Sequence, residues 1–336
     1  MLDVHRLRLL RELDRLGTLA AVARALSYSP SAISQQLSQL EAETGVTLLE
    51  PAGRGVRLTT QARILVGHTE AILERLELAE ADLRASLTDV GGTLRVASFQ
   101  SVLLALVPAA LTLLAEQHPD LRIEITHAEA EPAFAGLIAH EFDVVLGEEY
   151  PGLPQPPVPG VQTQQLALDE LLLAAPTHGP YARGGEGEAP TRLAELADVP
   201  WIIDPNDSPP GQWARALCRT AGFEPDVRFE SPDLLLQIHL VEKGHAAALL
   251  PGLLLDTDSG HAMRISRLPG RPHRRLLTGV RAGASRHPAV RAFRNALKQG
   301  LRQTTEADTP ADTPADAAAD AAGATRGRII GRTPSV

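Results

Sequence analysis

Residues 18–41 read TLAAVARALSYSPSAISQQLSQLE, and this stretch decides the fold of the N-terminal part of the chain. Its first half has the apolar spacing of a short amphipathic helix, with Thr18 as its cap: Leu19, Val22, Ala23 and Leu26. A short turn follows, and Ser29 can cap a second helix that begins at Pro30, where the missing N–H costs no hydrogen bond. Two short helices joined by such a turn, and preceded by a further helix at about 4–16, predict a helix-turn-helix.

The second helix has two different sides. Its buried side is apolar and consists of Ile33, Leu37 and Leu40. Its open side carries short hydroxyls and an amide, from Ser31, Ser34, Gln35 and Ser38. Hydroxyls suit phosphates, Gln can pair with adenine, and the free N–H groups of a helix N-terminus bind phosphate. Such a face by itself is often only a solvated surface, but its place after a turn and before a basic loop favours DNA binding.

The next segment predicts a wing and then a long helix. Residues 45–49 and 56–58 form two short extended pieces around a Gly-rich, basic tip at 51–55. Thr59 can then cap a helix that runs to about residue 87. One narrow stripe of this otherwise charged helix is apolar, which favours a dimer seam over a helix packed only on its own domain; its residues are Leu65, Ile72, Leu76, Ala79 and Leu83.

After a turn at 89–92 the chain alternates short strands and helices, which is typical of a sheet with crossover helices. The expected strands are 93–97, 121–126, 143–146, 171–175, 201–203, 247–250 and 276–280. The expected helices are 101–117, 132–140, 213–221, 232–243 and 288–301. A Gly-rich stretch at 183–187 predicts an exposed loop, and residues 303–336 are too polar and repetitive to bury a core, so we expect a disordered tail.

Charge and cysteine content limit the function classes. The formal net charge is −9, yet residues 1–65 carry +2 and the remainder −11, so DNA contacts should be confined to the N-terminal unit. The single Cys218 excludes an intrachain disulfide and a Cys-based zinc cluster, and it fits a reducing cytoplasm. We find neither a signal peptide nor an apolar run long enough for a membrane span, which predicts a cytoplasmic protein without a membrane partner.

The N-terminal pattern resembles the signature of LysR-type transcriptional regulators over residues 2–62. The matching positions are 19–26, Ser29, 31–34, 40–41, 45–46, 48–49 and 58–59. The resemblance implies that the second helix enters the major groove, that Arg54 and Arg57 of the wing contact DNA, and that the long helix dimerises. The full set expected at the DNA interface is Thr18, Ser29, Pro30, Ser31, Ala32, Ser34, Gln35, Ser38, Arg54, Arg57 and Thr59. Departures from the family pattern at Pro30, 49–51 and Ala62 indicate an operator preference of its own.

Beyond residue 93 a weaker resemblance is to the family's periplasmic-binding-protein-like sensor, an α/β domain of two lobes. The expected organisation is therefore an α/β chain with an all-α winged helix-turn-helix at 1–58, a linker helix at 59–88, an effector domain at 91–302 and the tail. Lobe 1 would comprise 93–166 and 271–302, and lobe 2 would comprise 167–270. Helix N-termini and strand ends between the lobes would donate N–H groups to an anionic or polar effector. The expected effector residues are Ser98, Phe99, Gln100, Ser101, Gly147, Glu148, Asp204, Ser208 and Ser231, although each hydroxyl alone is also a plausible helix cap.

No enzyme constellation is evident, so we expect neither catalysis nor a cofactor or metal. Residues 183–187 lack the Gly-Lys-Ser/Thr of a phosphate-binding loop, and no Gly-x-Ser-x-Gly elbow occurs. The expected partners are double-stranded operator DNA, a small-molecule effector, further copies of the chain in a dimer or tetramer, and RNA polymerase. Two alternatives stay open, namely a small-molecule binding protein and a constitutive regulator without an effector response.

Overall fold

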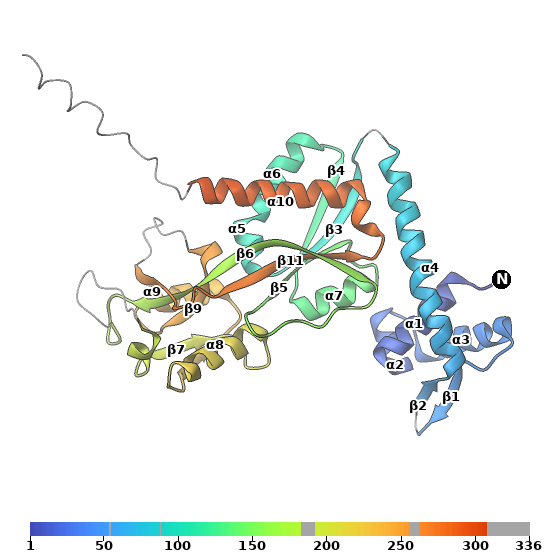
Figure 1. Cartoon of the computed structure of the whole chain (residues 1–336), viewed down its shortest axis with the longest axis horizontal. Helices are drawn as coiled ribbons and strands as arrows, with labels where there is room; N and C mark the ends of the chain where they lie inside the picture. Colours follow the sequence, from blue (N-terminus) through green and yellow to red (C-terminus); the bar gives the residue numbers. More distant parts are fainter. Residues whose placement is uncertain (54, 88, 183–191, 256–261, 308–336) are drawn as a thin grey trace, which may run out of the picture.

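The computed structural model describes residues 1–53, 55–87, 89–182, 192–255 and 262–307. Arg54, the Gly-rich stretch at 183–187 and most of the expected tail lie outside these residues. Within them, the chain forms an N-terminal helical domain with a wing, one long helix, and a larger α/β domain (Figure 1).

The N-terminal domain is the expected helix-turn-helix. It consists of α1 (Val4–Leu16), α2 (Leu19–Ala25) and α3 (Pro30–Thr44), which pack around a core of leucines. The Thr18 and Ser29 hydroxyls cap α2 and α3 by accepting from the N–H groups of Ala21 and Ala32. Both caps were predicted from the sequence and are confirmed.

The wing is an antiparallel pair of strands, β1 (Leu49–Ala52) and β2 (Gly55–Leu58). The first extended piece was predicted at 45–49. This prediction is wrong, because Gly45 adopts a left-handed φ of 68° and ends α3. The first strand therefore occupies part of the segment expected as the tip, and Pro51 pairs with Val56 within it.

The linker helix α4 (Thr60–Ala85) begins at the expected cap, where the Thr59 hydroxyl accepts from the Ala62 N–H. One side of α4 packs on its own chain through Ala62, Val66, Thr69 and Ala81. Figure 1 shows that α4 leads from the winged domain to the α/β domain. It is the longest helix in the described residues, and no described helix has the length and apolarity to cross a lipid bilayer.

Lobe 1 of the α/β domain is built on a mixed sheet. Its parallel strands are β3 (Gly92–Ser98), β4 (Leu121–His127) and β5 (Val144–Glu149), and its helices are α5 (Gln100–Ala105), α6 (Val107–Gln117), α7 (Ala130–Ile138) and α10 (Pro288–Ala307). The single helix expected at 101–117 is divided at Leu106, next to Pro108, which has no N–H for the preceding turn. The final helix α10 continues to Ala307, so the expected tail begins later than residue 303.

Two long antiparallel strands join the lobes (Figure 1). These are β6 (Val161–Pro176) and β11 (His273–Arg281); β6 pairs with β11 along lobe 1 and then with β9 (Ala248–Pro251) and β10 (Met263–Arg267) in lobe 2. Lobe 2 also holds the parallel pair β7 (Pro200–Ile203) and β8 (Asp226–Glu230), with helices α8 (Pro209–Thr220) and α9 (Leu234–Glu242). The sequence reading missed β8, β10 and the first half of β6, because all three are rich in charged or polar residues.

Candidate DNA-binding face and effector cleft

The residues expected to read DNA lie together on one face of α3. Ser31, Ser34, Gln35 and Ser38 are exposed, whereas Ile33, Leu37 and Leu40 on the opposite side are fully buried. Pro30 at the start of the helix is also exposed, and Ala32 is half-buried. The helix therefore presents its hydroxyls and amide to the exterior while its apolar side anchors it to α1 and α2.

Three hydroxyls of the expected DNA set already serve as helix caps. Thr18 and Ser29 cap α2 and α3, and Thr59 caps α4 and also donates to the Thr47 carbonyl at 2.9 Å. Their structural roles do not need DNA. Of the expected set, Ser31, Ser34, Gln35 and Ser38 have no such capping role to a helix of the described chain.

The described side of the wing carries an exposed ion pair. The Arg57 guanidinium lies 2.7 Å from the Glu50 carboxylate, and 65% of the Arg57 side chain is exposed. A surface pair of this kind contributes little to stability, so Arg57 can exchange Glu50 for a phosphate. Arg54 lies outside the described residues.

The predicted seam of α4 is exposed over most of its length. Ile72, Leu76 and Leu83 are 37%, 44% and 70% exposed, and Ala79 is exposed as well. Leu65 differs, because it is half-buried against the core of the N-terminal domain. The part of α4 beyond the winged domain thus carries an unpartnered apolar stripe, as a dimer seam would.

A cleft lies between the two lobes and collects five of the nine residues expected to bind an effector: Phe99, Gln100, Ser101, Glu148 and Asp204. The sequence reading missed most of the other residues that line it, notably Glu129, Tyr150, Trp213, Gln237 and Arg274. The cavity volume is about 40 Å³, which is room for about three water-sized groups. A larger ligand would require the lobes to separate.

The remaining four expected residues do not line the cleft. Ser98 is fully buried beneath it, and Phe134 covers Gly147. Ser208 caps α8 by accepting from the Gly211 N–H, and the Ser231 hydroxyl accepts from the Asp233 N–H. Ser208 is therefore a helix cap, which was the alternative expected from the sequence, whereas α9 is capped by Asp233 and not by Ser231.

Arg274 forms the floor of the cleft and is 1% exposed. Its guanidinium donates to Asp169 on β6, to Glu148 on β5 and to the Ser101 hydroxyl on α5. Burial opposes the charged form, but the carboxylates outweigh it and raise the pKa of Arg274. The sequence held a signal for this residue, because Arg274 alternates with Leu276 along β11 and so falls on the buried face of the strand.

Asp204 follows β7 and faces the same cleft; Arg215 donates to its backbone carbonyl at 2.9 Å, but its carboxylate has no basic partner among the described residues. Its carboxylate accepts from the Gln237 side chain at 2.9 Å. Burial, which outweighs that hydrogen bond, and the nearby carboxylates of Glu148 and Glu129 raise the pKa of Asp204 to about 6. Burial likewise raises the pKa of Glu148, against the opposing effect of Arg274.

The Gln100 side chain joins the two lobes beside the cleft. The Gln100 amide, at the start of α5, donates to the Asp233 carboxylate at 2.9 Å. Its carbonyl oxygen accepts from the Leu234 N–H at 2.8 Å. Gln100 belongs to lobe 1, whereas Asp233 and Leu234 lie at the start of α9 in lobe 2, so both bonds hold the cleft closed at this point.

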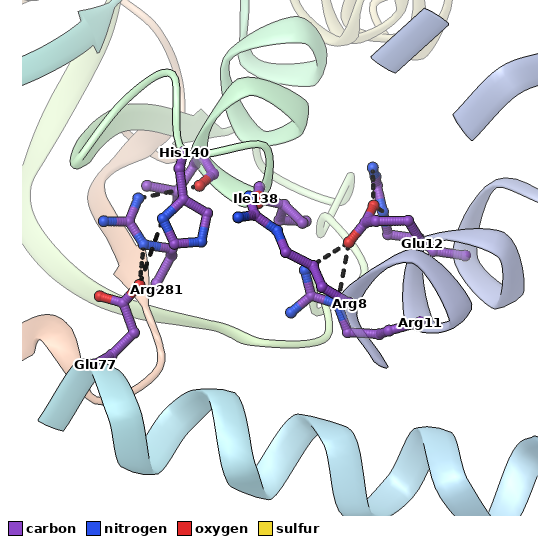
Figure 2. A network of polar contacts seen from close by, with 9 residues as sticks. Arg8, Arg11, Glu12, Glu77, Ile138, His140 and Arg281 are labelled. Atoms are coloured by element: carbon purple, nitrogen blue, oxygen red, sulfur yellow. Dashed lines mark hydrogen bonds and ion pairs between the residues drawn. The ribbon is translucent and has the colours of Figure 1, made fainter. Parts of the chain in front are cut away.

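Figure 2 shows how the winged domain and α4 contact lobe 1. The Arg8 guanidinium donates to the Ile138 carbonyl at 3.1 Å, and Arg281 pairs with Glu77 of α4. Burial, with Arg281, Arg8 and further basic neighbours, lowers the pKa of His140 to about 3, so its 3.7 Å contact with Glu77 involves a neutral imidazole. The C-terminal end of α7 is therefore tied to both N-terminal elements.

Comparison with known proteins assigns both domains to described families. Residues 4–63 match the family described as bacterial regulatory helix-turn-helix protein, lysR family, and residues 88–302 match the LysR substrate binding domain. The chain is 26% identical over 260 residues to the transcriptional regulator GbpR of Azospirillum brasilense, covering 77% of this chain and 74% of that one. It is 27% identical over 237 residues to TcbR of a Pseudomonas species, covering 70% and 78%.

The same architecture occurs in solved structures. A full-length OxyR variant from Pseudomonas aeruginosa has a TM-score of 0.58 at 19% identity, covering 89% of this chain and 95% of that one. An OxyR mutant of Corynebacterium glutamicum with bound hydrogen peroxide has a TM-score of 0.54 at 20% identity, covering 92% and 95%. These likenesses concern the fold, while the two family matches extend over most of the sequence. The chain therefore belongs to the LysR family of bacterial transcriptional regulators, with a helix-turn-helix DNA-binding domain and an effector-binding domain.

Proposed function

We propose that this regulator binds operator DNA as a dimer and responds to a small organic cation between its lobes. The observation that carries the proposal is the charge of the cleft: its lining holds three carboxylates and one guanidinium, which pairs with Glu148 and leaves Glu129 and Asp204 without it. The exposed face of α3 and the wing would bind DNA, and the exposed stripe of α4 would join the protomers. The protein would act in the cytoplasm, through binding rather than catalysis.

The DNA interface is tested by salt dependence. Arg54→Ala and Arg57→Ala should each flatten the slope of log affinity against log salt by up to about one unit, because each removes one phosphate contact. Arg122→Ala on β4 is the control, since its side chain is 74% exposed but belongs to lobe 1. Unchanged slopes in both wing variants would exclude the wing from the interface.

The dimer seam is tested by placing charge on it. Ile72→Asp combined with Leu76→Asp should abolish the dimer in sedimentation experiments, because two charges would be buried against the partner. Leu168→Asp puts the same charge on an exposed apolar residue of β6 and should leave the dimer intact. A dimer that survives the double substitution would place the interface elsewhere.

Two helix N-termini beside the cleft have no N–H groups left for an anion. The first two residues of α8 are Pro209 and Pro210, which have no N–H, and the Gly211 N–H donates to Ser208. At α9, the Leu234 N–H donates to Gln100 and the Leu235 N–H to Asp233. The sequence predicted an anionic or polar effector, and these two N-termini offer nothing to an anion, whereas the N-terminus of α5, which also borders the cleft, has no side-chain cap.

The side chains of the cleft also favour a cation. Glu129, Glu148 and Asp204 line it, and Arg274 is the only basic residue in its described lining. Three nitrogen atoms of Arg274 already donate to other groups, so no basic side chain is available to pair with a carboxylate ligand. Asp204 would accept the ammonium group as a charge-assisted hydrogen bond.

The walls of the cleft suit the organic part of such a ligand. Phe99, Tyr150 and Trp213 contribute aromatic surface, and Leu249 and Pro251 contribute aliphatic surface. Aromatic faces attract cations electrostatically, in addition to burying apolar area. We therefore assign the effector to the class of small primary amines with an apolar body.

Matched probes test this class on the full-length protein. Propylammonium and benzylammonium should bind at least about tenfold more tightly than propionate and benzoate in calorimetric titrations. Asp204→Asn should weaken ammonium binding about 10- to 100-fold while still accepting a hydrogen bond from Gln237. Asp226→Asn, on the outer strand β8, is the control. Tighter binding of the carboxylates would refute the cationic class while leaving the DNA experiment unaffected.

Peroxide sensing, suggested by the OxyR structures, is disfavoured by one residue. Cys218 on α8 is the single cysteine of the chain and is fully buried. Burial, together with the Glu224 carboxylate, raises the pKa of its thiol to about 12. Because the thiolate is the reactive form, Cys218 is suited to packing in the core of lobe 2 rather than to reaction with peroxide.

A further inference from the structure

A second hollow, which we call the basic groove, lies on lobe 1 away from the effector cleft. It is formed by the start of β6, the short helix η3 (Ala284–Arg286) and one side of α10. Its volume is about 540 Å³, which falls within the range of small-molecule sites. The basic residues that line it are Arg286, Arg291, Arg294 and Lys298.

Arg294 is the buried base of this groove, with 7% of the residue exposed. Its guanidinium donates to the Thr278 hydroxyl at 2.9 Å and to the Thr278 carbonyl at 3.5 Å. It forms no ion pair with any described carboxylate. Burial alone lowers the pKa of Arg294, and no charged neighbour contributes. A buried guanidinium without a counter-ion is unfavourable unless something else supplies the negative charge.

The rest of the groove adds positive charge and none that is negative. Arg286 and Arg291 are exposed, Lys298 is half-buried, and none of them pairs with a described carboxylate. The other lining residues, which include Gln164 and Asn295, are neutral hydrogen-bonding groups. This concentration of unpaired cations occurs in a chain whose net charge is −9, so it is not a consequence of overall composition.

We infer that the basic groove binds a small phosphate-bearing anion, at a site separate from the effector cleft. Arg294 would supply the planar pair of N–H groups that suits phosphate oxygens, and the three rim cations would balance the remaining charge. Gln164 and Asn295 would hydrogen-bond the uncharged part of the ligand. The bound anion would supply the counter-ion that Arg294 lacks.

The shape and position of the groove distinguish this ligand from operator DNA. Arg294 is recessed in a concave site, whereas phosphates on a duplex are reached by side chains that project from the surface. Figure 1 also shows α10 along the upper edge of lobe 1, with the wing at the lower end of the molecule. A small anion that enters the groove fits this arrangement, and the backbone of a duplex does not.

Calorimetry and thermal shift on the full-length protein test the inference, with inorganic phosphate, pyrophosphate and adenosine monophosphate as probes against sodium chloride of equal ionic strength. At least one probe should bind and raise the melting temperature. Comparison of the three separates free phosphate from a phosphate ester as the natural ligand. Arg294→Met should weaken binding about tenfold or more, and Lys298→Ser should weaken it by a smaller factor.

The controls make each outcome decisive. Arg122→Ala removes an exposed arginine of β4 and should leave phosphate binding unchanged. Circular dichroism of Arg294→Met confirms that the variant is folded, and the rim variant Lys298→Ser gives an independent measurement. The inference is overturned if none of the three probes binds beyond the chloride control, if Arg294→Met binds as well as the wild type, or if Arg294→Met flattens the salt dependence of DNA binding.

Discussion

Arg274 and Arg294 are both buried arginines of lobe 1, yet their surroundings are opposite. Arg274 is 1% exposed and donates to two carboxylates and a hydroxyl. Arg294 is 7% exposed and has only Thr278 as its partner among the described residues. The comparison shows that burial alone does not assign a role to a charged side chain, because the decisive quantity is the compensating charge that the fold supplies.

A buried charge that the protein itself balances has a structural role, whereas a buried charge without such a balance can bind a ligand. Arg274 ties β5, β6, α5 and β11 together at the floor of the cleft, and its charge is fully balanced within the protein. Asp204, above it, has no such balance and is therefore available to a cation. Arg294 carries the opposite charge to Asp204 and likewise has no compensating charge among the described residues, so it is available to an anion.

Substitution of Arg274 should have the largest effect on the free energy of unfolding. Arg274→Ala should lower the free energy of unfolding by about 3–5 kcal/mol, because it leaves Glu148 and Asp169 buried without their cation. Denaturant unfolding measures the loss. Arg122→Ala on β4 is the control; that side chain is 74% exposed in a pair with Glu124, which is 43% exposed, and its loss should cost about 0–1 kcal/mol. Equal losses in the two variants would contradict the structural role of Arg274.

Substitution of Asp204 should raise the free energy of unfolding, whereas substitution of Arg274 lowers it, and the increase should depend on pH. Burial raises its pKa from an ordinary 3.8 to about 6, so the folded state holds its proton more tightly than the unfolded state. Its contribution to stability therefore falls as the pH rises between about 4 and 6, and stays low above that range. Asp204→Asn removes the titration, leaving Glu148, Glu129 and Gln237 around the site.

At pH 7 this variant should unfold with a free energy about 1–3 kcal/mol higher than the wild type. At pH 4 the difference should vanish, because Asp204 is then protonated in the folded state. Denaturant unfolding at the two pH values measures both quantities. A variant that is less stable than the wild type at pH 7 would mean that the ionised carboxylate stabilises the cleft.

Arg294 should behave differently from Arg274 when its charge is removed. Arg294→Met should change the free energy of unfolding by less than about 1 kcal/mol, because no buried carboxylate is left behind and the hydroxyl of Thr278 keeps its bond to the Gln164 carbonyl. The same unfolding experiment, without phosphate in the buffer, measures it. A loss as large as that of Arg274→Ala would show that the fold depends on this guanidinium.

Substitution of Arg8 should have the smallest effect on the free energy of unfolding. It donates to the Ile138 carbonyl, but its Nε atom is buried without a described partner, and burial and the adjacent Arg11 lower its pKa. Arg8→Met should therefore shift the unfolding free energy by no more than about 0.5 kcal/mol. Hydrogen exchange should nevertheless report weaker protection at the end of α7, where the contact is lost.

Arg281→Ala provides the comparison for this contact. Because it leaves the half-buried Glu77 without its cation, it should cost about 1–3 kcal/mol. If Arg8→Met proved equally costly, the winged domain would be held to lobe 1 as firmly as α4 is.

Much of the N-terminal domain could be predicted because its signals are local. The hydroxyls of Thr18, Ser29 and Thr59 cap their helices through hydrogen bonds within three residues along the chain. The apolar periodicity of α3 likewise predicts its buried side, because one helix turn brings neighbours in sequence onto one face. The exposed seam of α4 follows the same rule.

The cleft was predicted less well because its contacts are distant in sequence. Gln100 and Asp233, which fasten the lobes, are separated by 133 positions, and Arg274 lies 173 positions from Ser101. The strands β8 and β10 were missed for a related reason, since their charged residues hide a period-two pattern that only pairing with neighbours reveals.

The sequence by itself thus determined the family, the helix-turn-helix, the caps and the exposed polar face of α3, because each depends on residues within a few turns of one another. Only the tertiary structure decided the charge of the effector cleft and the existence of the basic groove. Compensation of a charge depends on which strands and helices meet around it, and Arg274 and Arg294 have the same side chain with opposite outcomes. Neither the charge of the cleft nor the existence of the basic groove can be inferred from the net charge of −9.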